Sequence, residues 1–148
     1  MITIRKIKRE DRACYLEMAK DFYSSDAVHQ NIPGECILRT FHELMRSEQY
    51  LLGYIMEYKG KTAGYALLAK TFSQEAGGMV LWIDELYVLS EYRRLGLGRA
   101  FFSYLKNNLC GNIKRIRLEA ESGNQEAISL YKRMGFQNLP YMQMIQDL

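Results

Sequence analysis

Hydrophobic spacing in the first third of the chain changes from a strand pattern to a helix pattern. Residues 2–8, ITIRKIK, alternate apolar and polar side chains as a half-exposed strand does. Residues 9–24 then place apolar side chains on one helical face, namely Tyr15, Leu16, Ala19, Phe22 and Tyr23. Pro33 and Gly34 interrupt the pattern. A second, short helix is predicted next from the same spacing of Ile37, Leu38, Phe41, Leu44 and Met45.

The middle of the chain is rich in β-forming residues. Residues 50–72 contain two such runs separated at Lys59-Gly60, and glycine allows the positive φ that a tight hairpin turn requires. A loop at 73–78 leads to residues 79–88, MVLWIDELYV, which are apolar enough to form a central strand covered on both faces. Asp84 and Glu85 are unexpected inside such a strand.

The last third predicts two helices and further strands. A helix from Gly98 carries Phe101, Leu105 and Leu109 on one face and ends at Gly111. Residues 114–121 form the next strand, and Asn124 caps a helix that ends at Gly135. Residues 136–148 are expected to add one or two short strands. The predicted order, β-α-α-β-β-β-α-β-α-β, is that of an α/β fold with a mixed sheet, in a single domain over residues 1–148.

Composition narrows the class of protein. The chain has 148 residues, of which 48% are hydrophobic, enough for one buried core. Its net charge of +3 is spread along the chain, which argues against a nucleic-acid partner. The three cysteines have no metal-ligand spacing, so no metal is expected. No apolar run approaches the ~18 residues of a membrane span, and residues 1–11 lack a signal-peptide core, so a cytoplasmic protein without membrane contact is expected.

Residues 92–99, YRRLGLGR, predict an anion site at a helix N-terminus. Unpaired backbone N–H groups and the helix dipole attract an anion there, glycine allows it to approach closely, and arginine suits a phosphate. A simple strand-to-helix turn with solvated arginines is the structural alternative. A dinucleotide fold is disfavoured because Phe101 replaces the third glycine, and a P-loop because no GK[ST] follows.

Two segments together resemble a known family. DELYVLSEYRRLGLGRAFFSYL resembles the acetyl-CoA-binding motif of the GNAT N-acetyltransferases, in which Arg93, Gly96 and Gly98 fill the pattern of Arg or Gln, two residues, Gly, one residue, Gly or Ala. ESGNQEAISLYKRMGF resembles the second signature of the family. The resemblance implies the GNAT fold, and acetyl-CoA as the co-substrate. The implied cofactor-binding residues are Leu86, Tyr87, Val88, Arg93, Arg94, Leu95, Gly96, Leu97, Gly98, Arg99 and Asn124.

The resemblance also implies catalytic roles. Tyr131 occupies the tyrosine position of the second signature, where the phenol protonates the departing thiolate or orients the sulfur; packing in the core is the structural alternative. The Val88 amide is expected to bind the thioester oxygen. Asp84 or Glu85 is expected to act as the base, directly or through water. Because neighbouring strand residues point to opposite faces, at most one of them looks into the cleft unless a bulge intervenes.

These features predict an N-acetyltransferase that moves an acetyl group from acetyl-CoA to a primary amine by direct attack in a ternary complex. A small-molecule acceptor is favoured, and residues 24–35 are expected to form its wall with Asp26, His29, Glu35 and the neighbouring Tyr23. Alternatives are an acetyltransferase acting on a protein amine, a catalytically silent CoA-binding sensor, and a small nucleic-acid-binding module. A homodimer is compatible with the sequence.

Overall fold

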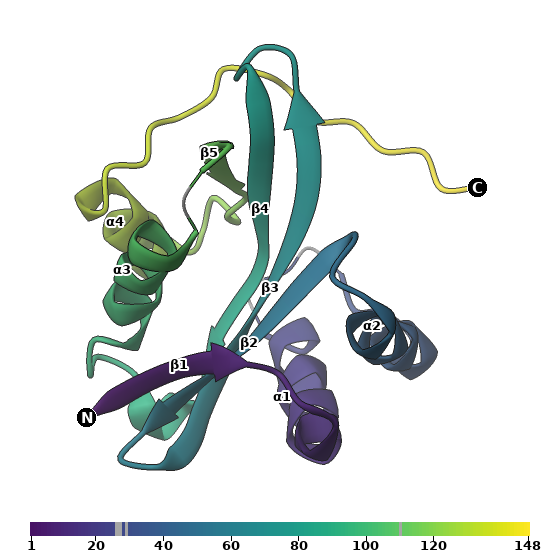
Figure 1. The fold of residues 1–148 in the computed structure, drawn as a ribbon, viewed down its shortest axis with the longest axis vertical. Coiled ribbons are helices and arrows are strands. Elements are labelled where there is room, and N and C mark those ends of the chain that lie inside the picture. The colour runs from purple at the N-terminus through teal and green to yellow at the C-terminus, as the bar shows by residue number, and fades with distance from the viewer. Residues whose placement is uncertain (26–27, 29, 110) are drawn as a thin grey trace.

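A computed structural model describes residues 1–25, 28, 30–109 and 111–148 of the chain. Its centre is one five-stranded sheet with the strand order β1-β2-β3-β4-β5 (Figure 1). The strands are β1 (Ile2–Lys6), β2 (Leu51–Tyr58), β3 (Lys61–Ser73), β4 (Gly78–Val88) and β5 (Ile113–Leu118). The first four pair antiparallel and β5 pairs parallel with β4, so the sheet is mixed as the sequence predicted.

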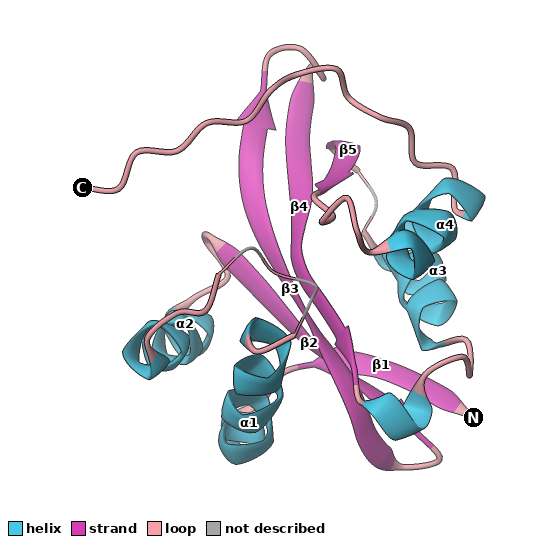
Figure 2. Cartoon of the chain, turned by 180° about the vertical axis from the view of Figure 1, so that it is seen from behind, coloured by secondary structure: helices cyan, strands magenta, loops and turns pink. Residues whose placement is uncertain are grey.

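Helices cover both faces of the sheet (Figures 1 and 2). One face packs against α1 (Arg12–Tyr23) and α2 (Gly34–Arg46), and the other against α3 (Leu97–Asn108) and α4 (Gln125–Arg133). Short 3-10 turns at Arg9–Asp11 and Ser90–Tyr92 precede α1 and follow β4. The second helix, expected to be short, has 13 residues and is slightly longer than α1, which has 12.

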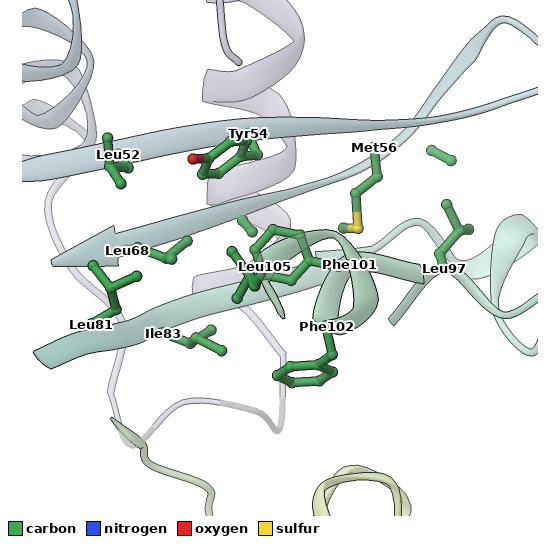
Figure 3. Close-up of a cluster of buried hydrophobic side chains, with 12 residues drawn as sticks. Leu52, Tyr54, Met56, Leu68, Leu81, Ile83, Leu97, Phe101, Phe102 and Leu105 are labelled. Carbon is green, nitrogen blue, oxygen red and sulfur yellow. The ribbon is translucent and has the colours of Figure 1, made fainter. Parts of the chain in front are cut away.

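Helix α3 lies against the centre of the sheet. Its apolar face buries Leu97, Phe101, Phe102 and Leu105 against Tyr54, Leu68 and Ile83 (Figure 3). Phe101 and Leu105 have no exposed surface. The helical spacing read from the sequence therefore identified the buried face correctly. Burial of each such side chain contributes roughly 1.5–3 kcal/mol to folding, and it fixes the start of α3 relative to the end of β4.

The predicted hairpin and the strand after it are also confirmed. Strands β2 and β3 pair across Lys59-Gly60, where both residues have positive φ. Strand β4 has buried residues on both faces of the sheet. Backbone pairing between β3 and β4 shifts at Leu67/Leu68: Leu67 lies opposite Glu85 and Leu68 opposite Ile83. Asp84 is therefore the extra residue of a β-bulge.

The strands expected within residues 136–148 are absent: after α4 the described chain contains no further strand. This segment leaves α4 and crosses the tip of the β3–β4 hairpin (Figure 1). It is rich in apolar residues, but no strand of the described chain pairs with it, and a strand without a partner is not stable in water. The prediction failed because composition indicates only that a segment can form a strand, whereas a strand also needs a partner.

Among the described residues, no helix combines the length and the apolar character that crossing a membrane would require.

Candidate active site

A cleft of about 950 Å³ lies between the end of β4, the start of α3 and the start of α4. Its walls contain most of the residues that the sequence predicted for the cofactor, together with Tyr131. The predicted residues that line it are Leu86, Tyr87, Val88, Arg93, Arg94, Gly96, Leu97, Gly98, Arg99, Asn124 and Tyr131. Leu95 is exposed and is absent from the lining. The two sequence motifs thus line the same cleft.

The N-terminus of α3 opens into this cleft without a capping side chain. Gly96 is the N-cap residue, with φ 88°, and Arg94 also has a positive φ of 64°. Left-handed residues in a turn can orient backbone N–H groups toward a concave side, a geometry that binds anions. The first turn of α3 has no acidic residue, and Arg94 and Arg99 line the cleft nearby. The loop therefore offers both the backbone donors and the positive charge that a pyrophosphate requires.

The two glycines of the loop serve different purposes. At Gly96 a Cβ would meet nothing within 4 Å, so space does not require glycine there. Glycine is required because the backbone is left-handed at this position, which other residues rarely adopt. Gly98 is in a tight position, because a Cβ would lie 3.0 Å from the end of the Leu130 side chain of α4, which would have to shift slightly. Gly98 thus allows α3 and α4 to approach each other at the cleft.

The end of β4 presents a free edge beside this loop. Strand β5 pairs with β4 only from Met79 to Ile83, so within the described chain the five residues from Asp84 to Val88 have no partner on that side. The Leu89 N–H donates to the Ala63 carbonyl on β3. Since successive N–H groups of a strand point to opposite sides, the Val88 N–H points to the free edge.

Arg93 ties the loop to this strand end. Its Nε donates to the Val88 carbonyl at 3.0 Å, and its guanidinium lies 5.9 Å from the centre of the Tyr87 ring. Arg94 pairs with Glu126 of α4 at 3.6 Å, but both side chains are exposed, so that ion pair adds little stability.

Helix α4 contributes a cap and a phenol. The Asn124 side chain accepts from the Ala127 N–H, as the predicted N-cap should. Tyr131 is half-buried, and its ring packs edge-on against Phe102 of α3. Tyr131 lines the cleft, and no described residue accepts a hydrogen bond from its hydroxyl. Burial raises the pKa of Tyr131, so the phenol is protonated at neutral pH.

The bulge separates the two acids of β4. Ile83 packs with α3, and without the extra residue Glu85 would face the same way. Instead Glu85 turns to the α1 face and is 8% exposed. Its two carboxylate oxygens accept from Tyr65 at 2.5 Å and from Tyr23 at 2.7 Å. Asp84 is exposed, and its carboxylate has no hydrogen-bond partner among the described residues.

Both acids have raised pKa values, and loss of solvation within the protein is the main cause for each. Burial raises the pKa of Glu85, and the hydrogen bonds from Tyr65 and Tyr23 partly oppose this. The surrounding protein raises the pKa of Asp84, and the nearby Glu119 carboxylate adds to the effect. Neither acid is among the residues lining the cleft, but Asp84 precedes Leu86, the first strand residue that lines it, by two positions.

A family model described as the acetyltransferase (GNAT) family matches residues 9–136. The chain belongs to the GNAT acetyltransferase family. The match spans both motifs and the helices on both faces of the sheet, so the GNAT fold predicted from the two signatures is confirmed.

Two curated proteins are similar over parts of this GNAT chain. "Probable N-acetyltransferase san" of Drosophila melanogaster is 41% identical over 59 residues, 38% of this chain and 32% of that protein. The spermine/spermidine N(1)-acetyltransferase of Bacillus subtilis is 31% identical over 84 residues, 54% of this chain and 55% of that protein. The alignments thus span about a third and about half of these relatives.

Solved structures share the fold over the whole chain. A possible acetyltransferase from Clostridium difficile 630 superimposes with a TM-score of 0.85 at 21% identity, covering 100% of this chain and 98% of that one. AAC(6')-Iy, in complex with the bisubstrate analogue CoA-S-monomethyl-acetylneamine, gives a TM-score of 0.76 at 15% identity, covering 100% and 99%. At these identities the likeness shows the GNAT fold alone.

Sequence reasoning missed the partners of Glu85. The sequence indicates Tyr23 only as a neighbour of the acceptor wall and does not single out Tyr65, because residue spacing carries no signal of the bulge that turns Glu85 toward them. Asp26 and His29 of the predicted acceptor wall lie outside the described residues. Glu35 lies in the first turn of α2, exposed and 3.9 Å from Arg39. In the described part of the chain, no group of three His, Cys, Asp or Glu side chains could hold a metal ion.

Proposed function

We propose that this GNAT chain transfers an acetyl group from acetyl-CoA to a primary amine of a small molecule, by direct attack in a ternary complex. One observation carries the proposal: an uncapped helix N-terminus, a free strand edge and an unpaired phenol all face a single cleft. A pyrophosphate, a pantetheine chain and a thioester need these three features, in this order.

The donor half of the site supplies backbone groups. The amides of residues 94–99, with Arg94 and Arg99, bind the pyrophosphate of acetyl-CoA. The pantetheine pairs with the free edge of β4 from Leu86 to Val88, as an added strand would. The Val88 N–H, which points to that edge, donates to the thioester oxygen and stabilises the negative charge that develops there.

Tyr131 supplies the proton that the leaving group needs. The amine nitrogen attacks the carbonyl carbon, the C–N bond forms, and the C–S bond breaks as the electron pair moves to sulfur. The thiolate takes the phenolic proton of Tyr131, and the amine loses one proton to a base. The raised pKa of Tyr131 keeps this proton in place before the reaction.

Asp84 is the better candidate for the base. Both oxygens of Glu85 already accept from tyrosines, whereas the Asp84 carboxylate is exposed at the point where β4 and β5 separate. It accepts the proton from the amine through water, since it lies outside the cleft lining. Its raised pKa brings a carboxylate base closer to neutral pH.

Two comparisons support a small acceptor. The Bacillus subtilis relative is named for spermine and spermidine, and AAC(6')-Iy is bound to a conjugate of CoA with acetylneamine. Both names refer to small molecules that carry several amines. The carboxylates of Asp84 and Glu119 give this side of the site a charge suited to such a cation.

The test is a thiol-release assay with acetyl-CoA over a panel of polyamines, aminoglycosides, amino-acid amines and peptide N-termini, with mass spectrometry of the product. Acetylation of a small amine is expected. Asp84→Asn should remove the low-pH limb of the rate profile, because the base must be ionised and its pKa is raised; Glu85→Gln should retain that limb. Acetylation of peptides alone would contradict the small acceptor, and loss of the limb only in Glu85→Gln would contradict Asp84.

A further inference from the structure

Glu85 is a buried carboxylate that takes no part in the proposed reaction. It is 8% exposed, and its two oxygens accept from the hydroxyls of Tyr65 and Tyr23. The other buried acid of the described chain, Asp11, pairs with Arg5, whereas no described lysine or arginine pairs with Glu85. Burying a carboxylate without a cation costs free energy that hydrogen bonds only partly offset. Packing alone therefore does not account for an acid at this position.

The two tyrosines that bond to Glu85 are held in different ways. Tyr65 lies on β3, is 1% exposed, and packs edge-on against the Tyr15 ring at 5.2 Å. Tyr23 is the last residue of α1, and its half-buried ring packs edge-on against its neighbour Phe22. Because packing already fixes Tyr65, the hydrogen bond to Glu85 matters most for Tyr23.

The end of α1 forms part of the cleft that holds the residues predicted for the cofactor. Ser24 and Ser25 line this cleft together with Leu86–Val88 of β4. Tyr23 directly precedes the two serines, and Glu85 directly precedes that stretch of β4. The hydrogen bond between Tyr23 and Glu85 therefore joins two walls of the cleft, although neither residue is part of the lining.

A second hydrogen bond crosses the same junction in the opposite direction. The Tyr87 hydroxyl of β4 donates to Asp21 of α1 at 3.1 Å, and both residues lie two positions from those of the first bond. Asp21 is exposed, so water competes for its carboxylate. The bond from Tyr23 to the buried Glu85 is shorter, at 2.7 Å, and is shielded from water. It is therefore the stronger link between α1 and this end of β4.

We propose that Glu85 is a positioning residue for the acceptor amine: through Tyr23 it holds the end of α1, with Ser24 and Ser25, as the acceptor-side wall of the cleft. This inference rests on the proposed function, since only a transferase positions an acceptor. None of the residues assigned to acetyl-CoA lies on α1, so this wall is left for the acceptor. Glu85 itself does not touch the amine, because both its oxygens are occupied and it does not line the cleft. A shift of the wall by about 1 Å is enough to disturb a well-oriented substrate.

The first experiment measures steady-state kinetics with the best amine of the panel. Tyr23→Phe and Glu85→Leu should each raise the KM for the amine about tenfold and leave the Kd for acetyl-CoA unchanged, because they loosen only the α1 wall. Glu85→Gln should keep this KM within about twofold of the parent value, since an amide accepts from one phenol and donates to the other. Tyr15→Phe is the matched control: it removes a hydroxyl of the same aromatic cluster that does not bond to Glu85, and should keep the parental KM.

Two kinetic results would overturn the proposal. One is an unchanged KM for the amine in either Tyr23→Phe or Glu85→Leu. The other is a loss of turnover in Glu85→Gln at an unchanged KM, which would make Glu85 the base and not a positioning residue.

The second experiment needs no turnover. The Ser24 and Ser25 N–H groups donate to carbonyls in the last turn of α1, so hydrogen exchange followed by mass spectrometry measures how firmly this end is held. Exchange across residues 21–25 should be at least about tenfold faster in Tyr23→Phe and Glu85→Leu, whereas residues 12–18 should keep the parental rate. Parental exchange at residues 21–25 would contradict the proposal. If exchange is faster but no amine of the panel is acetylated, the proposed function fails while the hold of Glu85 on α1 stands.

Discussion

Helices α3 and α4 both begin at the cleft, yet the protein holds them in different ways. Four residues of α3 are buried against the centre of the sheet, and Phe101 and Leu105 are completely enclosed. Helix α4 has no buried residue and lies beside β5, a six-residue edge strand that has none either. The β4–α3 unit contributes buried residues to the core, whereas the β5–α4 unit packs against the core with partly exposed residues only.

This difference assigns separate tasks to the two walls of the cleft. A backbone cradle works only if its N–H groups keep their positions, and the packing of α3 provides that rigidity. A phenol that donates a proton needs access to the cleft, which the looser α4 allows for Tyr131. Loss of packing should therefore be costly on the α3 side, and loss of a single functional atom should be costly on the α4 side.

The largest expected effect is on stability. Phe101→Ala should lower the free energy of unfolding by about 3–5 kcal/mol, because it leaves a cavity in the enclosed core. Met134→Ala on the α4 side should cost less than about 2 kcal/mol, since that side chain is half-exposed. Urea unfolding of both variants measures the difference. An equal loss of unfolding free energy in both variants would mean that α3 and α4 are equally well packed.

Tyr131→Phe tests whether α4 contributes chemistry rather than packing. Turnover should fall about 100-fold, because the proton donor is lost while the ring still packs on Phe102. The Kd for acetyl-CoA should stay nearly unchanged. Tyr104→Phe, on α3 and away from the cleft lining, is the matched control and should keep full turnover. Unchanged turnover in Tyr131→Phe would make Tyr131 a packing residue.

Gly98→Val tests the contact between the two walls. A side chain at this position would press on Leu130 and move α4 away from α3, as well as crowd the pyrophosphate. The Kd for acetyl-CoA should rise at least about tenfold, equal to ~1.4 kcal/mol. Gly34→Val is the control, because a Cβ there meets nothing within 4 Å. Calorimetric titration gives both Kd values. An unaltered affinity of Gly98→Val for acetyl-CoA would contradict the binding of the pyrophosphate at the start of α3.

The smallest expected effect concerns Glu85, on the well-packed side of the molecule. The pKa of Glu85 is raised in the folded protein, so the folded state binds its proton more tightly than the unfolded chain does. Its contribution to stability is complete below the ordinary pKa of 4.5 and is lost as the pH rises through the folded value. Glu85→Gln should flatten this part of the pH dependence of unfolding. A slope identical to that of the parent would contradict the burial of an ionisable Glu85.

Local sequence determined most of the elements and the donor half of the site. Helical spacing identified the buried face of α3, glycine marked the hairpin turn, and Asn124 marked the start of α4. These features depend on residues close together in the chain, because capping, turns and amphipathic faces are local properties. The loop from Arg93 to Arg99 could be predicted for the same reason, because its glycines and arginines lie next to the helix that it begins.

Tertiary structure decided what local spacing leaves open. The bulge at Asp84 depends on the register of β3 against β4, and it alone turns Glu85 toward Tyr23 and Tyr65, which lie 62 and 20 positions away. Residues 136–148 are rich in apolar side chains, yet the described chain gives them no strand partner. A strand forms only where a second strand meets its backbone groups, so pairing and register are set by contacts distant in sequence, and no periodicity along the chain encodes them.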